Sequence, residues 1–485
     1  MAVLIGVDLG TTKITAVALD AESGELLGVH GEANTANITS AEDKARDRSE
    51  WDAAAIVKIG VQRLRRLAES LGDRRGDVAA IGVTGQQHGV VLVDDHASPV
   101  TPLINWQDRR ALEPVEAGHL GTWLDLAREH VGADASLRTG CRLQPGFMGV
   151  TLFRLARQGQ LPAACKTAVF IMDLFAAALA GTRPVSEPTC AASSGLFNFR
   201  LRQWDNESIR SLGLAHSMFP EIVEADRPMG RLSAALADAT GLPEGTPIVG
   251  PLGDHQASFV GSVDRPLSTG LVNVGTGAQA AVFVETGEFH PPVEVRPYPI
   301  HGNLLSNVGL AGGWAYQTLE RFFRDVGEAF FPGQVPGSLY SRMNELAAQV
   351  PAGANGVTSV PTFSGTRSDP TLRGSFTGLA PSSFRVAEMC RAVIEGMAQS
   401  LTDGLHTSEM QAGRKVQGLA AAGNGLRENP LLAAEVERKT GRPIRYTRHR
   451  EEAAFGAALV AGVGAGVYSD LASGGTRVRY EEPRQ

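Results

Sequence analysis

The sequence predicts an α/β protein built from two related halves. Its 485 residues are enough for two or three domains, and 43% of them are apolar, which excludes a mostly disordered chain. Apolar segments with the spacing of strands alternate with segments that have the spacing of amphipathic helices. A strand, a turn of small residues and a second strand occur at 3–19 and again at 270–284, and this echo indicates two similar halves.

Charge and composition argue against a protein that binds nucleic acid or spans a membrane. The chain carries 45 basic and 52 acidic residues, whereas a protein that holds nucleic acid through its phosphates normally has a basic excess. We therefore expect no nucleic-acid partner, while a local nucleotide site stays open. The four cysteines form no C-x-x-C pair, which favours reduced thiols in a cytoplasmic protein. The uncharged run 453–468 is shorter than a membrane span and predicts a buried helix, so no membrane partner is expected.

The elements of the first half follow from apolar runs and glycines. Residues 3–7 and 14–19 are expected to form strands joined by a tight turn. A helix should begin near Asp52, with Ser49 and Asp52 as a capping box. Strands at 78–84 and 90–93 are expected to flank a polar turn. The predicted buried stripe of the helix is Ile56, Ile59, Gly60, Leu64, Leu67 and Leu71.

The second half repeats this scheme. Strands are expected at 270–274, 279–284 and 418–422. A long helix should start near Ala387, and another should run from Pro430 to the residue before Gly441, since proline favours the first turn of a helix and glycine its end. The buried stripe predicted for the long helix is Cys390, Val393, Met397, Leu401 and Leu405.

A stretch rich in glycine and proline separates the two halves in the sequence. It runs over 241–247 and precedes a new apolar strand, which predicts domains at 1–249 and 250–485. The same stretch, extended to 253, is a candidate hinge.

The turn that follows the first strand could bind a metal-bound phosphate. Asp8 ends the strand, and Gly10, Thr11, Thr12 and Lys13 follow it. Backbone N–H groups and hydroxyls in such a turn can hold phosphate oxygens, and a carboxylate beside them suits Mg²⁺. The alternative is an ordinary hairpin in which Asp8 caps the turn. No Walker A sequence occurs, which argues against a P-loop enzyme.

Asp254 is the candidate for a catalytic base. It follows an apolar strand that ends in Gly253, and phosphoryl transfer to an alcohol needs a base placed at the hydroxyl. The alternative is that Asp254 caps the next helix, and spacing does not separate the two interpretations.

Two polar clusters and several glycine turns complete the candidate site. Residues 85–89 and 105–109 are dense in hydrogen-bonding groups and contain Trp106, which is typical of a sugar-binding lining. The glycine turns at 275–277 and 423–425 follow strands and would allow a nucleotide to approach the backbone closely.

These segments resemble, in order and over nearly the whole chain, the FGGY carbohydrate kinases of the actin/hexokinase/Hsp70-like superfamily. The C-terminal signature of that family also fits, as Gly374-x-Phe376-x-Gly378-Leu379 followed after eight residues by Glu388-Met389-x-x-Ala392-Val393-Ile394-Glu395. The resemblance implies two actin-like ATPase (ribonuclease H-like) domains with a cleft between them. It also implies ATP and Mg²⁺ as cofactors and a small ketose as substrate, and it leaves a homodimer open.

By the same resemblance, each candidate residue receives a role. Asp254 looks like the base, and Asp8 looks like the carboxylate that organises Mg²⁺ through water. The phosphate contacts would be Gly10, Thr11, Thr12, Lys13, Gly275, Thr276 and Gly277. The adenosine site would include Gly423, Asn424 and Asn429. The sugar pocket would include Gln87, His88, Trp106, Asp108, Asp254 and His255.

Within the family the chain looks most like sedoheptulokinases and next like xylulokinases. The segments that carry this likeness are 106–108, 252–258, 296–298 and 340–343. The implied reaction is phosphorylation of the terminal primary hydroxyl of a ketose, sedoheptulose giving sedoheptulose 7-phosphate. The alternatives are a D-xylulose kinase and, more remotely, a non-catalytic nucleotide-dependent binding protein. The chain departs from the family at Gln86-Gln87-His88, Thr151, Arg154 and His255, and most of these residues belong to the sugar side.

Overall fold

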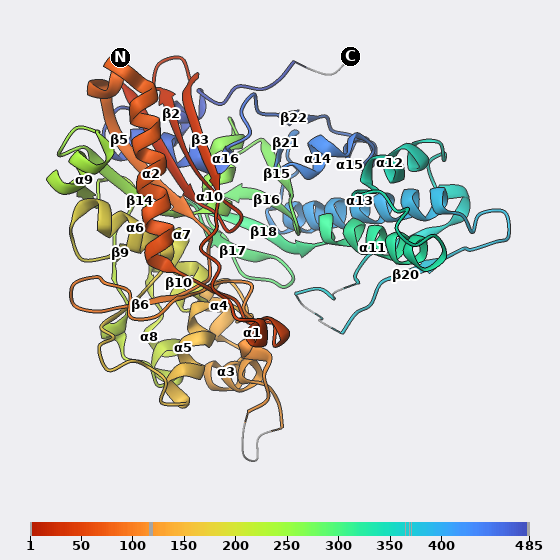
Figure 1. The fold of residues 1–485 in the computed structure, drawn as a ribbon, viewed down its shortest axis with the longest axis horizontal. Coiled ribbons are helices and arrows are strands. Elements are labelled where there is room, and N and C mark those ends of the chain that lie inside the picture. The colour runs from red at the N-terminus through yellow and green to blue at the C-terminus, as the bar shows by residue number, and fades with distance from the viewer. Residues whose placement is uncertain (1, 116–119, 364, 368, 370, 483–485) are drawn as a thin grey trace.

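The computed structural model describes residues 2–115, 120–363, 365–367, 369 and 371–482. It consists of two α/β halves that lie side by side, each around a sheet of six strands (Figure 1). The first half contributes the red-to-green part of the chain and the second half the green-to-blue part.

The sheet of the first half has the order β13-β14-β5-β1-β2-β3. β1 pairs antiparallel with β2, and β2 pairs antiparallel with β3, while β5 and β14 continue the sheet parallel to β1. The strands are β1 (Val3–Leu9), β2 (Lys13–Asp20), β3 (Leu26–Ala33), β5 (Val78–Gly85), β13 (Gly230–Arg231) and β14 (Pro247–Gly253).

The sheet of the second half has the order β17-β18-β16-β15-β21-β22 and repeats that arrangement. β15, β16 and β18 form an antiparallel series, and β21 and β22 continue parallel to β15. The predicted echo between the halves is therefore confirmed. The strands are β15 (Thr269–Val274), β16 (Ala278–Val284), β17 (Glu294–Pro297), β18 (Asn303–Leu310), β21 (Gly418–Ala422) and β22 (Ile444–Tyr446).

Three predicted helices are present, with one correction at a cap. α2 (Ala53–Leu71) is capped by Asp52 alone, whose side chain accepts from the Ala55 N–H. The predicted capping box with Ser49 is wrong, because the Ser49 hydroxyl accepts from the Trp51 indole instead. α13 (Val386–Gln411) buries its predicted stripe, and α15 (Pro430–Thr440) ends at Gly441 in the left-handed conformation.

Two helices lie between the sheets and join the halves. α10 (Asp254–Ser262) follows the last strand of the first sheet, and α16 (Glu452–Gly464) follows the last strand of the second. α16 packs on β1 and β5 of the first sheet as well as on α10. The two helices cross so closely that a Cβ on Gly456 would lie 1.8 Å from the Ala257 carbonyl oxygen, so this position requires glycine.

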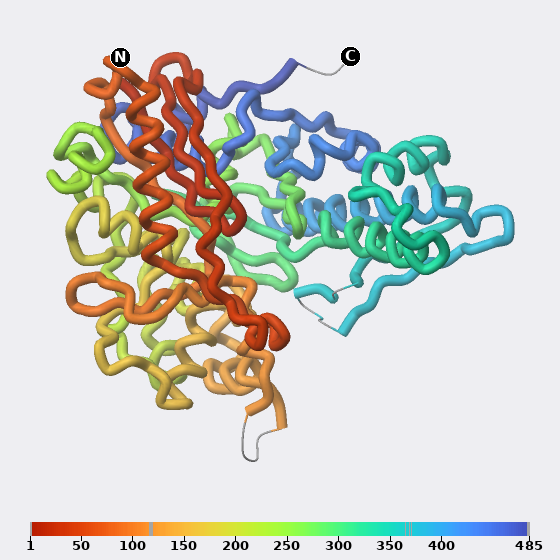
Figure 2. The backbone as a smooth tube through the Cα atoms, viewed as in Figure 1, coloured from red at the N-terminus to blue at the C-terminus, as the bar shows by residue number. Residues whose placement is uncertain are grey.

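The chain path follows from this packing. Figure 2 shows the blue C-terminal part returning to the first half, where α16 contacts β1. The buried helix predicted at 453–468 is present as α16. Within the described residues, no helix is both long and apolar enough to span a membrane.

The remaining helices are α1 (Ala41–Ala45), α3 (Trp123–Val131), α4 (Ala135–Thr139), α5 (Met148–Arg157), α6 (Ile171–Ala180), α7 (Pro188–Ala191), α8 (Asn206–Ser211), α9 (Ala234–Thr240), α11 (Gly313–Phe330), α12 (Tyr340–Ala348), α14 (Gly425–Glu428) and α17 (Leu471–Gly475). The short strands are β4 (Glu50–Trp51), β6 (Val91–Val93), β7 (Leu103–Ile104), β8 (Thr167–Val169), β9 (Val185–Ser186), β10 (Phe197–Asn198), β11 (Gln203–Trp204), β12 (Glu221–Ile222), β19 (Thr358–Val360) and β20 (Ser375–Thr377). Of these remaining elements, α6 and α7 pack on β14, and others, such as α3 and α12, lie farther from the sheets (Figure 1).

The structure also bears on the predicted boundary and hinge. The boundary between residues 249 and 250 falls inside β14, which pairs with β5 in the first sheet. A hinge over 241–253 is wrong for the part that forms β14, because a buried strand held in a sheet cannot supply free rotation. Where the two domains divide stays a prediction.

Candidate active site

Asp8 lies at the end of β1, where its carboxylate enters a site rich in acidic groups. Its Oδ1 atom is buried and has no hydrogen-bond partner among the described residues. Burial, together with the charges of Asp254 and Glu451, raises the pKa of Asp8 to about 8. Asp8 and Asp254, which the sequence places 246 positions apart, therefore lie close enough in the fold to interact electrostatically.

The turn after Asp8 combines exposed and internally bonded residues, and its role as a phosphate site stays a prediction. Thr12 and Lys13 are exposed, whereas Thr11 is half-buried. The Thr11 hydroxyl donates to Gln86 Oε1 at 3.1 Å and accepts from the Trp106 indole at 2.9 Å. The Gly10 carbonyl accepts from the Asn34 amide at 3.0 Å. These hydrogen bonds hold Gly10 and Thr11 in place, while Thr12 and Lys13 stay exposed to solvent.

The second half contributes two further carboxylates. Glu451 pairs with Lys13 at 2.6 Å, which links the start of α16 to the first turn. Glu452, the first residue of α16, is buried and accepts a hydrogen bond from the Gly423 backbone. Burial nevertheless raises the pKa of Glu452 to about 7. Sequence reasoning missed both residues, although two acids just before an apolar helix were a visible signal.

Asp254 is the first residue of α10, and the residue that caps this helix is Gly253. The Oδ1 atom of Asp254 accepts from the His255 N–H at 2.8 Å. Burial raises the pKa of Asp254 to about 6. A carboxyl whose pKa lies just below neutrality is ionised at pH 7 and still basic enough to accept a proton from an alcohol in a transition state.

The donor set near Asp8 fits a magnesium ion that is bound to phosphates. Asp8 has a buried oxygen without a partner, and the neighbouring carboxylates add negative charge that Lys13 alone does not balance. Mg²⁺ prefers oxygen ligands and commonly binds through one or two carboxylates plus substrate phosphates. Within the described residues, His, Cys, Asp and Glu form no group of three or more that could hold a metal alone.

The second glycine turn joins the strand pair of the second half that corresponds to the β1–β2 pair of the first. The residues Gly275, Thr276 and Gly277 connect β15 to β16 and are exposed. The carbonyl oxygens of Gly275 and Thr276 accept from the Gly313 and Trp314 N–H groups at 3.0 and 2.9 Å, so the start of α11 holds this turn. The backbone of the turn is thus fixed and accessible, as a phosphate site requires.

The predicted adenosine residues follow β21. Gly423 has a φ of 72°, and a Cβ there would lie 2.7 Å from Asn273 Oδ1, so only glycine fits. Asn424 is exposed. Asn429 is buried and caps α15, because its side-chain oxygen accepts from the Leu432 N–H at 3.0 Å. A contact between Asn429 and a nucleotide stays a prediction.

Two histidines mark the predicted sugar side. His88 stacks on Phe147, with ring centroids 4.2 Å apart, and its Nδ1 donates to the Ser193 carbonyl at 2.8 Å. Burial and the nearby Arg296 hold the pKa of His88 well below its usual value. His255 Nε2 bonds to the Ser306 hydroxyl at 2.9 Å, and burial lowers the pKa of His255 to about 4. Both rings are therefore neutral at pH 7.

The remaining predicted sugar residues differ in how far their side chains are already engaged. Trp106 bonds to Thr11 and so connects the sugar side to the phosphate turn. Gln87 donates to the Thr189 carbonyl at 2.8 Å. Asp108 is buried and accepts from the Ser49 and Arg110 N–H groups and from the Arg110 guanidinium. These bonds make Asp108 an anchor of its own loop, and its contact with a sugar stays a prediction.

An arginine pair beside the histidines was not singled out from the sequence. Arg296 and Arg367 both pair with Glu294, and both guanidinium groups lie within 6 Å of the Phe147 ring centroid, at 5.7 and 5.8 Å. Guanidinium groups only donate hydrogen bonds, so they suit the carbonyl and hydroxyl oxygens of a sugar. Arg296 lies in the segment 296–298 that resembles the heptulose enzymes, which was the available signal.

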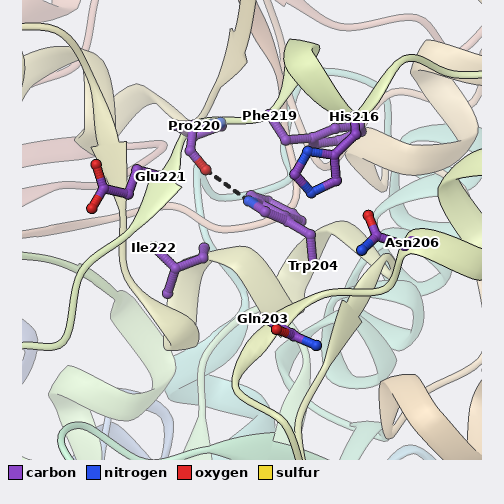
Figure 3. A pocket seen from close by; sticks show the side chains of 8 residues that line it. All are labelled: Gln203, Trp204, Asn206, His216, Phe219, Pro220, Glu221 and Ile222. Atoms are coloured by element: carbon purple, nitrogen blue, oxygen red, sulfur yellow. Dashed lines mark hydrogen bonds between the residues drawn. The ribbon is translucent and has the colours of Figure 1, made fainter.

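A separate cavity of about 270 Å³ opens elsewhere in the first half (Figure 3). Trp204 forms its floor and donates to the Pro220 carbonyl at 2.7 Å. None of its lining residues belongs to the predicted site. They are Gln203, Trp204, Asn206, His216, Phe219, Pro220, Glu221 and Ile222.

Comparison with known protein families identifies the family of this chain. Residues 3–261 match the N-terminal domain of the FGGY family of carbohydrate kinases, and residues 270–465 match its C-terminal domain. The chain belongs to the FGGY family of carbohydrate kinases. This FGGY protein is accordingly an ATP-dependent carbohydrate kinase, and its actin-like fold follows the expectation drawn from the sequence.

Individual relatives of this FGGY kinase act on different substrates. The chain is 28% identical to a sedoheptulokinase from Homo sapiens over 94% of its length and 97% of the relative. It is 29% identical to a glycerol kinase from Thermus brockianus over 97% of its length and 91% of the relative. The structure of xylulose kinase from Rhodospirillum rubrum superimposes with a TM-score of 0.84 at 24% identity, covering 99% of this chain and 93% of that one.

The departures of this FGGY kinase from the family pattern have a structural setting. Arg154 on α5 is buried and pairs with Glu113 at 2.6 Å, so it belongs to an ion-pair network in the interior of the first half. Thr151 is buried on the same helix. Among the described residues, neither side chain has a hydrogen bond or ion pair with His88 or His255.

Proposed function

We propose that this kinase transfers the γ-phosphoryl group of ATP to the terminal primary hydroxyl of sedoheptulose, giving sedoheptulose 7-phosphate. The observation that carries the phosphoryl transfer is the placement of Asp254 at the start of α10, electrostatically coupled to Asp8 and next to His255. This arrangement supports the proposal, because the proposed proton acceptor lies near the first turn and next to His255 in the chain.

In the proposed reaction, Asp254 accepts the proton of the sugar hydroxyl as its oxygen attacks the γ-phosphorus in line. The exposed residues of the first turn and the turn at 275–277 hold the phosphate oxygens, with Lys13 released from Glu451 to face them. Mg²⁺, when bound with ATP near Asp8, neutralises charge on the phosphates. Positioning and charge neutralisation supply most of the rate, because a phosphoryl group needs little covalent help.

Two features support sedoheptulose as the sugar. A human sedoheptulokinase and a mouse sedoheptulokinase are each 28% identical to this chain over 94% of its length. The segment 296–298, which resembles those enzymes, contains Arg296, whose charge acts on both His88 and His255. Arg367 adds a second set of donors there.

A panel assay tests the proposal. ADP release is measured with sedoheptulose, D-xylulose, D-ribulose, D-fructose and glycerol at equal concentration, and the product of the preferred sugar is identified by mass and NMR. We expect the highest kcat/KM with sedoheptulose and phosphate on its terminal carbon. A higher kcat/KM with D-xylulose or glycerol would reassign the substrate, and ATP hydrolysis without any sugar phosphate would contradict the transfer itself.

A further inference from the structure

A chain of buried hydrogen bonds ends at Gly253, the residue before the proposed base Asp254. The reaction described above does not use the residues of this chain. It begins at Glu187, which caps the short helix α7. One carboxylate oxygen of Glu187 accepts from both the Thr189 N–H at 2.6 Å and the Thr189 hydroxyl at 2.5 Å. The Thr189 hydroxyl in turn accepts from the Gly253 N–H at 2.8 Å. Glu187 and Thr189 are fully buried.

The direction of each bond in this chain is determined. A hydroxyl has one hydrogen, and the hydroxyl of Thr189 gives it to Oε2 of Glu187, whose pKa burial raises to about 8. The oxygen of the same hydroxyl accepts from the Gly253 N–H, since a backbone N–H can act only as a donor. Gly253 is the last residue of β14 and the N-cap of α10. The hydrogen bond to its amide therefore holds the backbone immediately before Asp254.

Neighbouring contacts hold the same few residues from the other side. The Thr189 carbonyl accepts from the Gln87 amide at 2.8 Å, and the Pro251 carbonyl accepts from the Cys190 thiol at 3.3 Å. The Leu252 carbonyl accepts from the Thr84 hydroxyl at 3.0 Å. The turn of the chain from strand to helix is thus fixed by side-chain bonds from α7 and the end of β5, in addition to the sheet.

From this geometry we infer that Thr189, oriented by Glu187, is the positioning residue that sets the place of the Asp254 carboxylate. The inference rests on the proposed role of Asp254. A base has to be held within about 0.5 Å of its productive position, and an error near 1 Å can lower turnover by about a hundredfold. Thr189 touches no substrate in this role and acts only through the backbone of Gly253.

The chain offers a matched control for a test of this role. Thr240 at the end of α9 is also buried, and its hydroxyl donates to the Leu236 carbonyl at 2.6 Å and accepts from the Leu242 N–H at 3.3 Å. The change Thr240→Val thus removes a buried hydroxyl that also donates one bond and accepts one from a backbone N–H, at a place outside the candidate site.

The variants Thr189→Val, Thr189→Ser and Thr240→Val are compared with the wild type in steady-state kinetics with the preferred sugar. We expect Thr189→Val to lower kcat by about 10–100-fold while the KM for ATP stays unchanged, because only the base is displaced. Thr189→Ser should restore kcat, since it keeps the hydroxyl, and Thr240→Val should leave kcat unchanged although it also lowers the melting temperature. Equal kcat values for Thr189→Val and Thr240→Val would overturn the inference. If Thr189→Val does not fold, Thr189→Ala removes the same hydroxyl with less bulk and decides the question.

Crystal structures separate this inference from the proposed function, because they need no substrate. We expect the Asp254 carboxylate of Thr189→Val to be displaced by about 0.5 Å or more from its wild-type position. An unmoved carboxylate would overturn the positioning role, whichever sugar the enzyme uses. A displaced carboxylate together with no sugar turnover by the wild type would contradict the proposed function and leave the positioning role supported.

Discussion

The two halves of the molecule share a strand order but differ in the chemistry of their turns. The first turn carries a carboxylate, two hydroxyls and a lysine at 8–13, whereas the second, at 275–277, carries only one threonine between two glycines. Both turns present backbone groups, but only the first presents charge. The repeated fold therefore supplies two similar turns after corresponding strands, and only the first of them carries charged side chains.

The helices that follow the last strand of each sheet show the same divergence. α10 begins with Asp254 and α16 begins with Glu452, so the two acids occupy corresponding positions. Asp254 is half-buried and has a pKa of about 6, whereas Glu452 is buried, has a pKa of about 7 and bonds to the Gly423 backbone. One acid is thus partly exposed, and the other is buried and bonded to a turn of its own half.

The strongest test of this comparison removes each acid in turn. Asp254→Asn should lower kcat by about 10²–10⁴-fold, because it removes the proton acceptor, while the Kd for sugar is retained. Glu452→Gln should lower kcat far less, since it keeps a hydrogen-bond acceptor for Gly423. Steady-state kinetics and isothermal calorimetry measure the two effects. Equal losses in both variants would mean that the halves share the catalytic work.

The pH profile sharpens the same contrast. Burial raises the pKa of Asp254 from 3.8 to about 6, so the base is ionised and active above that pH and protonated below it. We expect kcat/KM for the sugar to fall about tenfold per pH unit below pH 6. The profile of Glu452→Gln should keep this acid limb. If the acid limb shifts in Glu452→Gln, the limb reports the ionisation of Glu452 and not that of Asp254.

The two turns can be compared through nucleotide affinity. Lys13→Met should raise the KM for ATP by about tenfold, because it removes a positive charge next to the phosphates, a loss near 1.4 kcal/mol. Thr276→Val should raise it less, since the backbone of that turn remains. The measurement is the KM for ATP at saturating sugar. A larger effect for Thr276→Val would place the triphosphate nearer to the second turn.

The smallest expected effect concerns the two asparagines of the second half. Asn429→Ala should cost about 1 kcal/mol of stability through the lost helix cap. Its effect on the KM for ATP should be smaller than that of Asn424→Ala, whose side chain is exposed. Thermal unfolding and ATP kinetics on both variants separate the cap from the nucleotide contact. A large KM change in Asn429→Ala alone would favour a direct contact with the nucleotide.

Short-range patterns made much of the fold predictable. The hairpins at 3–19 and 270–284 follow from apolar runs separated by glycine and threonine, and both are present. The long helix α13 follows from the spacing of its apolar residues. The capping box at Ser49 failed because α2 begins at Ala53 and Asp52 is its cap, so Ser49 lies before the helix and its hydroxyl accepts from Trp51 instead.

Long-range contacts were out of reach of the same reasoning. Lys13 and Glu451 are 438 positions apart, so no local sequence pattern predicts their ion pair. Asp108 and Asn429 have the residue types of ligand contacts, yet their oxygens are engaged by backbone N–H groups nearby. Polar residues beside a site serve ligands and backbone equally well, and only the three-dimensional partners tell the two uses apart.

The exchange of α10 and α16 between the halves has a consequence for how the enzyme comes into being. A buried cluster that contains Leu4 and Val249 of the first sheet also contains Leu271 of the second and Phe455 of α16. The first sheet therefore lacks one of its covers until the last few dozen residues have been synthesised. Because α16 covers β1 and β5, we expect neither half to fold stably as a separate fragment.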